Sequence, residues 1–408
     1  MYTTIYSPFF PLVIFLITYC SVFYMRMRVE ETSLMQREVA IDGLRGILAL
    51  MVVFCHAGCW YLYATTGRWD YPTPLFFHLG HTGVTLFFMI TAFLFTSKLL
   101  NHSTSPISWS RLYVSRILRI YPLFISVITI VIFIVLIETN FNLNVPLSTF
   151  ITSIFKWYTF TMFGSDNING YQGTFSVIAS VQWTLIFEWF FYLALPIIGV
   201  IFFKNKSYGV AIICALLLAV VIPNAMRLNA NINFLPKAFL TGILVAVISK
   251  KLKLHAFLRS PIVGFLAIML IYLQFLNLFQ LGPKNQDRQS ILFLSMAFFV
   301  IAHGNLLLGL LNTKTMRFLG DISYGIYLMH GIVYFCVLKY VVGLNVIKTV
   351  TPITYWFIVG IVTLTTVFLA YLSYCYIEMP AMKHLKPIAT WLKAQSNLLN
   401  NKIKLNHK

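Results

Sequence analysis

The sequence has 408 residues, of which 59% are hydrophobic and only 10% are charged. Roughly a quarter of the residues of a soluble domain are charged, so this composition excludes an ordinary soluble protein. Apolar runs of about 20 residues recur along the chain, which is the length that crosses a bilayer. The net charge of +19 is spread over short segments between these runs, as the positive-inside rule describes, and it is not gathered on one polar surface as in a nucleic-acid binder.

The apolar runs predict an all-α polytopic membrane protein, with a ten-helix bundle and one extra N-terminal helix that is not cleaved as a signal peptide. The six cysteines all lie inside apolar runs and are expected to be small core residues, neither disulfide partners nor metal ligands. In chain order the expected spans are 5–25, 41–63, 82–99, 121–138, 181–203, 208–223, 236–250, 260–281, 290–311, 322–342 and 353–376.

The segment 148–164 is long enough to cross the membrane, but it carries Lys156 and several hydroxyl groups. If it crossed, every later loop would change sides, and Lys204, Lys206 and the KKLK stretch at 250–253 would lie outside. That arrangement contradicts the positive-inside rule. We therefore predict a re-entrant or interfacial segment on the outer side.

Three regions follow from these boundaries. Residues 1–36 are predicted to form the extra transmembrane helix and a cytoplasmic linker. Residues 37–381 form the membrane-embedded domain. Residues 382–408 form a basic cytoplasmic tail, which is suited to lie on anionic lipid.

Few ionisable side chains lie within the apolar runs, and each is a candidate for function because charge is costly inside a bilayer. In IDGLRGILALMVVFCHAGCW, Arg45 lies at the cytoplasmic mouth and His56 follows eleven residues later. Eleven residues are three turns of helix, so both side chains share one face about 16 Å apart. A cation at the mouth and an imidazole near the midplane suit a ligand with an anionic head and a reactive far end. A buried, satisfied histidine beside a positive-inside arginine would give the same pattern.

Glu188 lies in the apolar run VQWTLIFEWFFYLALP, with Tyr192 one turn further on the same face. A carboxylate there needs a partner, and we predict that it orients His56 and stabilises the protonated imidazole of a general base. The alternative is a hydrogen bond that holds two helices together.

Three arginines, Arg111, Arg116 and Arg119, precede a helix that is expected to begin at Tyr121. Guanidinium groups near a helix start can hold phosphates through bidentate contacts. On composition alone, positive-inside charge is the better explanation for them.

The run FLGDISYGIYLMHG carries Ser323, Tyr324, Tyr327 and His330. The hydroxyl groups of Ser323, Tyr324 and Tyr192 could donate to an oxyanion, and His330 could contact an acceptor, although an aromatic stripe of this kind usually serves packing. His78 and His81 lack carboxylate or thiol support, so no metal site is expected.

Taken together, these segments resemble the acyltransferase 3 family of integral membrane acyltransferases, over residues 41–380. Thr91 and Ala92 stand where the family usually has Ser-Gly, a change that would affect helix packing there. The motifs in family order are DGLRGILALMVVFCH (42–56), GVTLFFMITAFLF (83–95), RLYVSRILRIYPL (111–123), WTLIFEWFFYLALP (183–196), LGDISYGIYLMH (319–330) and the closing YLSYCYIEMP (371–380).

The resemblance implies a multi-pass protein of the bacterial cytoplasmic (inner) membrane that O-acylates a surface glycan or lipid-linked glycan. It implies an acyl-CoA donor, most often acetyl-CoA, on the cytoplasmic side and an acceptor hydroxyl on the outer side. By the same resemblance, Arg45 and His56 are the paired essential residues, Arg116 and Arg119 match arginines assigned to the donor phosphates, and Glu188 matches the carboxylate after Trp-Thr-Leu. Relatives with an extracytoplasmic hydrolase-like domain complete the transfer there, so this chain is expected to act alone or with a separate protein.

Two other functions fit parts of the pattern. A proton-coupled transporter of an anionic solute could use Glu188 and His56 as a relay, but no inverted repeat or paired broken helices support it. A non-catalytic scaffold would have little reason to place Arg45, His56 and Glu188 in these runs. The acceptor glycan is left open.

Overall fold

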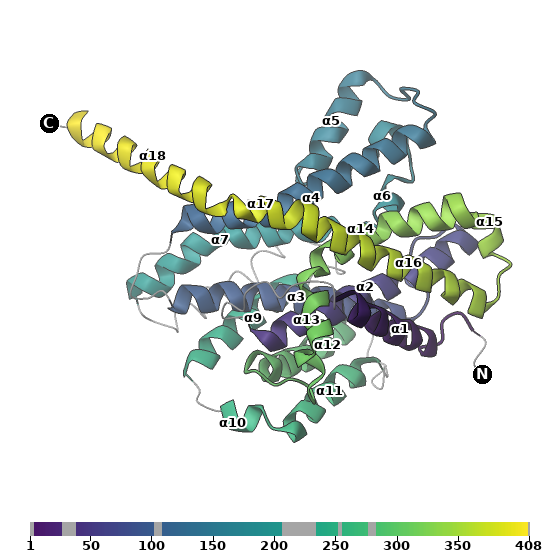
Figure 1. Cartoon of the computed structure of the whole chain (residues 1–408), viewed down its shortest axis with the longest axis horizontal. Helices are drawn as coiled ribbons and strands as arrows, with labels where there is room; N and C mark the ends of the chain where they lie inside the picture. Colours follow the sequence, from purple (N-terminus) through teal and green to yellow (C-terminus); the bar gives the residue numbers. More distant parts are fainter. Residues whose placement is uncertain are drawn as a thin grey trace.

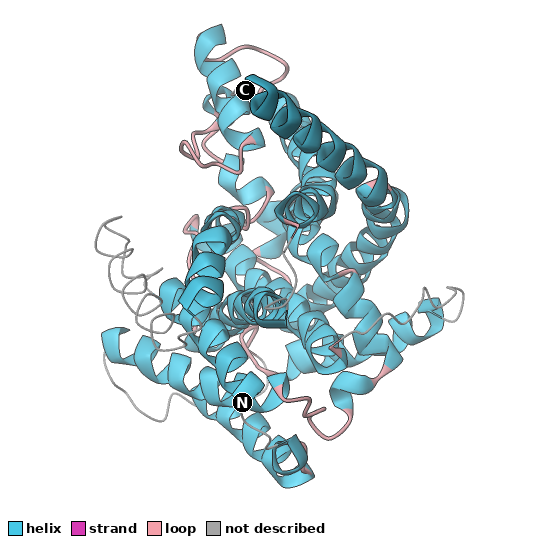
Figure 2. Cartoon of the chain, turned by 90° about the vertical axis from the view of Figure 1, so that its left-hand side faces the viewer, coloured by secondary structure: helices cyan, strands magenta, loops and turns pink. Residues whose placement is uncertain are grey.

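The computed structural model describes residues 4–26, 38–101, 108–205, 234–251, 255–275 and 283–406. Within these ranges the regular elements are all helical, and no strand is drawn among them (Figure 2). A helix satisfies its own backbone polar groups, which hydrocarbon cannot do. The predicted all-α class is therefore confirmed.

The helices pack as a bundle from which α5 and α18 project (Figure 1). Short helical turns lie at Ile168–Gly170 and Leu310–Asn312, and π-helical stretches at Cys336–Val342 and Tyr374–Glu378. The α-helices are α1 (Phe9–Arg26), α2 (Val39–Thr66), α3 (Pro74–Asn101), α4 (Trp109–Glu138), α5 (Leu147–Tyr158), α6 (Thr174–Val177), α7 (Trp183–Asn205), α9 (Phe234–Lys251), α10 (His255–Leu258), α11 (Pro261–Phe275), α12 (Pro283–Ala302), α13 (Lys314–Asp321), α14 (Ser323–Phe335), α15 (Leu344–Ile347), α16 (Pro352–Ser373), α17 (Met379–Lys383) and α18 (Leu385–Asn406).

Five helical stretches in the described ranges are long and apolar enough to cross a membrane, which makes this a multi-pass membrane protein. The predicted span 208–223 and the end of the predicted span 260–281 lie outside those ranges. The expected count of ten helices plus one therefore stays a prediction. The five stretches are Val39–Thr66, Pro74–Asn101, Trp109–Glu138, Ser323–Val342 and Pro352–Gln395, and shorter apolar helices are Phe9–Tyr24, Trp183–Gly199, Pro261–Phe275 and Gln289–Ala302.

Helix α4 begins twelve residues before the start that we expected at Tyr121, so that expectation was wrong. The Ser108 hydroxyl caps the helix by accepting the backbone N–H of Arg111 at 3.4 Å. Pro122 lies inside the helix and removes one backbone donor, but buried Ile120 and Leu123 on either side of it hold the helix in the core. Consequently the arginine cluster lies on a helix and not in a loop before one.

Helix α5 covers only the first part of the segment 148–164. Its 12 residues rise about 18 Å, less than the roughly 30 Å of a hydrocarbon core. Leu147, Ile151 and Phe155 are exposed on this helix, and Lys156 pairs with Asp166 at 2.5 Å. This amphipathic form supports an interfacial location, which stays a prediction.

Helix α2 is packed between α3, α13 and α14. On α13, Gly320 lies so close to the Asp42 carbonyl that a Cβ there would overlap it, and Gly43 meets Leu311 in the same way. The absence of side chains lets the α2 and α13 backbones touch. This contact brings the start of α14 beside the arginine end of α2.

The Thr91-Ala92 pair of α3 faces α9 without opening a gap. Ala92 is fully buried, and a Cβ on Gly242 of α9 would lie 2.5 Å from the Ala92 Cβ. Gly242 of α9 therefore allows the close helix contact at the position where α3 has Ala92 in place of the usual glycine.

The basic tail, for which no secondary structure was predicted from the sequence, is helical in its described part. Helices α17 and α18 continue the direction of α16 (Figure 1). Trp391 on α18 is 59% exposed. An exposed tryptophan on a basic helix is typical of a membrane interface.

Candidate active site

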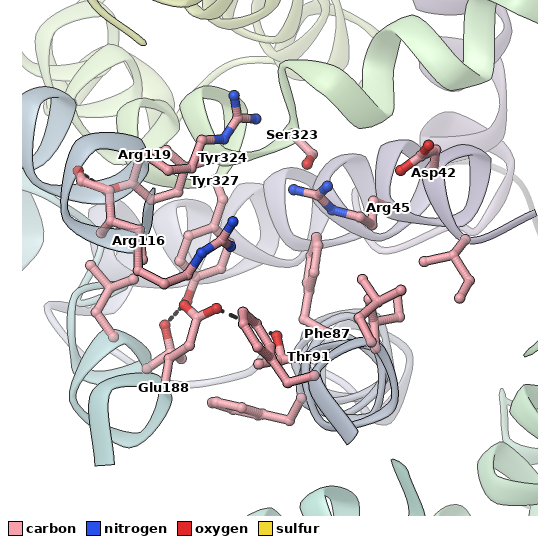
Figure 3. A pocket seen from close by; sticks show the side chains of 18 of the residues that line it. Asp42, Arg45, Phe87, Thr91, Arg116, Arg119, Glu188, Ser323, Tyr324 and Tyr327 are labelled. Carbon is pink, nitrogen blue, oxygen red and sulfur yellow. Dashed lines mark hydrogen bonds between the residues drawn. The ribbon is translucent and has the colours of Figure 1, made fainter. Parts of the chain in front are cut away.

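A cavity of about 470 Å³ lies between α2, α3, α4, α7 and α14. Figure 3 shows guanidinium groups from α2 and α4 and the carboxylate of Glu188 directed into it. The structure thus brings residues of all six sequence motifs together in one space. The polar residues that line the cavity include Asp42, Arg45, Thr91, Arg116, Arg119, Thr184, Glu188, Tyr192, Asp321, Ser323, Tyr324 and Tyr327.

Two of the predicted arginines have side chains placed to meet an anion. Arg45 is half-buried and lies across the cavity from α4. The Arg116 guanidinium lies 5.2 Å above the centroid of the Phe95 ring, so stacking fixes its direction. Arg111 differs from both, because it is exposed and does not line the cavity. Arg111 therefore lies apart from Arg116 and Arg119, the two arginines of the same helix that line the cavity.

Arg119 lines the cavity but is bound to other parts of the protein. One Nη donates to the Asp321 carbonyl at 2.9 Å, and the other lies 3.3 Å from Glu378 Oε2. Glu378 is fully buried, in the closing IEMP sequence. A buried carboxylate needs a counter-charge. Arg119 therefore joins α4 to α13 and to the π-helical stretch Tyr374–Glu378 at the end of α16. Glu378 lies in the closing motif YLSYCYIEMP, and no contact of this residue was predicted from the sequence.

Glu188 does not contact His56, and our prediction of that pair was wrong. The Tyr192 hydroxyl donates to Glu188 Oε1 at 2.5 Å, and the Thr91 hydroxyl donates to the same oxygen at 3.4 Å. Tyr192 thus lies on the same face as Glu188, as predicted, and is its hydrogen-bond partner. Two hydroxyl groups satisfy the carboxylate within the cavity, and it has no need of an imidazole.

His56 is paired instead with His330. Nε2 of His330 lies 3.2 Å from Nδ1 of His56, and the ring centroids are 4.9 Å apart. His330 is fully buried and His56 is half-buried, and neither lines the cavity. The candidate base is therefore oriented by His330 of α14. From the sequence, His330 was expected only to contact an acceptor.

The partners of the two rings indicate which nitrogens carry protons. His56 Nδ1 lies 2.9 Å from the Val52 carbonyl, and His330 Nδ1 lies 3.1 Å from the Ile326 carbonyl. Carbonyls only accept, so in the neutral pair both Nδ1 atoms are protonated. His330 Nε2 is then an acceptor for His56 Nδ1–H, and His56 Nε2 is the basic nitrogen. His56 also contacts the backbone of Ala179.

The predicted oxyanion donors are all engaged within the protein. Tyr192 donates to Glu188, the Ser323 hydroxyl donates to the Gly320 carbonyl at 2.7 Å, and the Tyr324 hydroxyl donates to the Ile120 carbonyl at 2.8 Å. Each hydroxyl has one proton to give. None of the three donates into the cavity in this arrangement.

Tyr327 borders both the cavity and the histidine pair. Its ring centroid lies 6.3 Å from that of the cavity residue Phe87 and 6.3 Å from that of His330. Its hydroxyl donates to the Val181 carbonyl at 3.0 Å and lies 2.9 Å from the Thr184 hydroxyl. The cavity that the arginines line thus adjoins the histidine pair at this ring.

Aromatic rings surround His56 on the side away from the arginines. The Trp69 centroid lies 6.2 Å from the His56 ring, 5.4 Å from Trp60 and 5.7 Å from Phe175. Trp69 and Phe175 are half-buried. They belong to the connection after α2 and to α6, and no periodic pattern in the sequence pointed to them.

His78 and His81 are buried among aromatic rings. His81 lies 4.4 Å from the Phe234 centroid and 5.2 Å from that of Phe77. Within the described ranges, no group of three or more His, Cys, Asp or Glu residues is placed to hold a metal ion. Their surroundings suit packing between α3 and α9.

Comparison with known proteins gives two findings. Residues 38–372 match a family described as an acyltransferase domain. The chain is also 25% identical over 365 residues to a protein named Nodulation protein 10 from Rhizobium leguminosarum bv. viciae, an alignment that covers 84% of this chain and 92% of that protein. No solved structure matches the chain.

Proposed function

Since this chain belongs to the acyltransferase 3 family and is a membrane acyltransferase, we propose that it acylates an extracytoplasmic glycan. The donor is acyl-CoA, with acetyl as the transferred group, and it binds from the cytoplasmic side. The acceptor is a hydroxyl group of O-antigen or another surface polysaccharide. The protein resides in the bacterial cytoplasmic membrane.

One observation carries this proposal: the arginine-lined cavity adjoins the His56–His330 pair at Tyr327, which lines the cavity and contacts His330. A CoA molecule has anionic phosphates at one end and a thioester at the other. Arg45 and His56 are about 16 Å apart along α2, on the order of an extended pantetheine arm. Phosphates bound by Arg45 and Arg116 would therefore bring the thioester to the histidines.

His56 supplies the base in this proposal. Its Nε2 takes the proton of the acceptor hydroxyl as the oxygen attacks the thioester carbonyl. The C–S bond then breaks, and the CoA sulfur receives the proton from the imidazolium. While His56 is protonated, its Nδ1–H donates to the Val52 carbonyl and to His330 Nε2, which stabilises the charge.

Glu188 has a different part from the one predicted. It lies in the donor cavity beside Thr91 and Tyr192. The amide N–H groups of a pantetheine arm are suitable donors to such a carboxylate. We assign Glu188 to positioning of the donor, and Arg119 to fixing α4 through Glu378.

The acceptor is expected to reach His56 from the side of Trp69 and Phe175, opposite to the cavity. Aromatic rings with polar groups nearby suit a sugar ring, and Arg68 and Asp70 flank Trp69 with 77% and 57% of their side chains exposed. The proposal thus assigns donor and acceptor to opposite sides of one membrane-embedded base.

The test compares surface glycans from cells with the gene, without it, and with the gene encoding His56→Ala. Mass spectrometry and NMR should detect an acyl ester only in cells with the intact gene. Radiolabelled acetyl-CoA should label glycan when supplied to the cytoplasmic face of membrane vesicles. Identical glycans in all three strains, together with no CoA-dependent labelling, would exclude this function.

A further inference from the structure

Three side chains line the end of the donor cavity that adjoins the histidine pair. Phe87 of α3, Thr184 of α7 and Tyr327 of α14 line it on the side nearest the histidine pair. Tyr327 is only 9% exposed and Thr184 only 7%. The arginines lie at the other end, so a donor whose phosphates meet the arginines has its acyl group at this wall.

The position of the Tyr327 side chain is fixed by four contacts. Its hydroxyl is held by the Val181 carbonyl and the Thr184 hydroxyl, and its ring meets Phe87 at an interplanar angle of 68°. On the opposite side it meets His330 at 63°. Moving the ring would break both hydrogen bonds of its hydroxyl group. The wall is therefore a fixed surface against which an acyl chain must fit.

The wall also lies close to the reacting atoms. Tyr327 precedes His330 by three residues, so the two α-carbons differ by about 4.5 Å along α14. A thioester carbonyl within reach of His56 lies next to this ring, and the acyl carbons extend along it. Each further methylene has to displace Tyr327 or Phe87, and a pocket that is one methylene too small discriminates by roughly 10- to 200-fold.

We propose that Phe87, Thr184 and Tyr327 form the acyl-group subsite and that the Tyr327 ring limits the donor to a short acyl chain. This inference rests on the proposed function and adds the chain length of the donor to it. Tyr327 is here a specificity-determining residue. Its hydroxyl matters only because it holds the ring.

Binding of CoA thioethers tests the subsite without knowledge of the acceptor. Ethyl-, butyl- and hexyl-CoA cannot transfer their chains, so affinity for the purified full-length protein in lipid nanodiscs reports fit alone. Wild-type protein should bind ethyl-CoA tightest, with a loss of tenfold or more for butyl-CoA. Tyr327→Ala should bring butyl-CoA within threefold of ethyl-CoA, and Tyr327→Phe should retain the wild-type order.

Tyr121→Ala is the matched control. Tyr121 is a half-buried tyrosine that does not line the cavity, and its hydroxyl donates to the Tyr158 carbonyl at 3.0 Å. It should leave the ratio of the two affinities unchanged. Phe87→Ala provides a second variant of the wall should Tyr327→Ala fail to fold, and it should also favour the longer chains.

Two outcomes overturn the inference. Equal binding of ethyl- and hexyl-CoA by wild-type protein would show that no wall limits the chain. An unchanged ratio in both Tyr327→Ala and Phe87→Ala would place the limit elsewhere. A wild-type protein that binds no CoA thioether at all, and no CoA, would instead contradict the proposed function itself.

Discussion

His330 Nε2 lies 3.2 Å from His56 Nδ1, a contact between α14 and α2 that joins two residues 274 positions apart in sequence. The hydrogen bond from His56 Nδ1–H to His330 Nε2 fixes the direction of the His56 ring. It also leaves Nε2 of His56 as the basic nitrogen. The histidine pair is therefore the unit on which the first two predictions depend.

His56→Ala should lower kcat for acyl transfer by about 10²- to 10⁴-fold, the contribution of a positioned general base. Expression and membrane insertion should remain normal, because removal of an imidazole from an apolar helix favours insertion. The control is His303→Ala, another buried histidine, whose Nδ1 donates to the Phe299 carbonyl at 2.7 Å outside the site. A His56→Ala protein that transfers acyl groups at the wild-type rate would remove this mechanism.

His330→Ala should also lower kcat, but the double variant with His56→Ala should be scarcely slower than His56→Ala alone. Residues that act as one unit lose function non-additively. Glu188→Gln should behave differently, with its main effect on KM for acyl-CoA. Steady-state kinetics on the four variants separate these cases, and multiplicative losses from His56 and His330 would show that the two rings act independently.

Arg116→Ala should raise KM for acyl-CoA by roughly tenfold or more, since a hydrogen bond to a charged group is worth about 1.5–3 kcal/mol. KM for the acceptor should change little. Arg111→Ala is the matched control, because it removes the same charge from an exposed position of the same helix. Equal increases of KM for both substrates would favour a role of Arg116 in folding instead of donor binding.

Arg119→Ala should destabilise the protein by about 3–5 kcal/mol, because it leaves the carboxylate of Glu378 buried without a counter-charge. Combining it with Glu378→Gln should recover part of that loss. Thermal unfolding in detergent, followed by tryptophan fluorescence, measures both. If Arg119→Ala unfolds at the wild-type temperature, the ion pair does not hold α4 to the end of α16.

The interfacial location of the segment 148–164 predicts which positions an impermeant thiol reagent can reach in intact cells. Ser165→Cys, on the exposed connection after α5, should be labelled. Asn312→Cys, an exposed position before the basic start of α13, should be shielded until the membrane is permeabilised. Both are made with Cys20 replaced by serine, since Cys20 is exposed. Labelling of Asn312→Cys in intact cells would reverse the assignment of sides.

The sequence by itself determined the class of fold and most of the candidate residues. Apolar runs of bilayer length admit only helices, because hydrocarbon cannot satisfy an open backbone. Arg45, His56 and Glu188 were identifiable because ionisable side chains are costly in such runs. Which residues share one face of a helix was also predictable from their spacing, as the contact between Glu188 and Tyr192 shows.

Only the tertiary structure decided which of these residues meet. Contacts between helices depend on the depth and rotation of each helix, and these are set by packing details such as the glycine contacts between α2 and α13. Sequence spacing contains no such information. For this reason Glu188 was assigned to His56, although hydroxyl groups of α3 and α7 satisfy it in the cavity. For the same reason the pairing of His56 with His330, the buried Glu378 beside Arg119 and the wall formed by Tyr327 became visible only once distant helices were brought together.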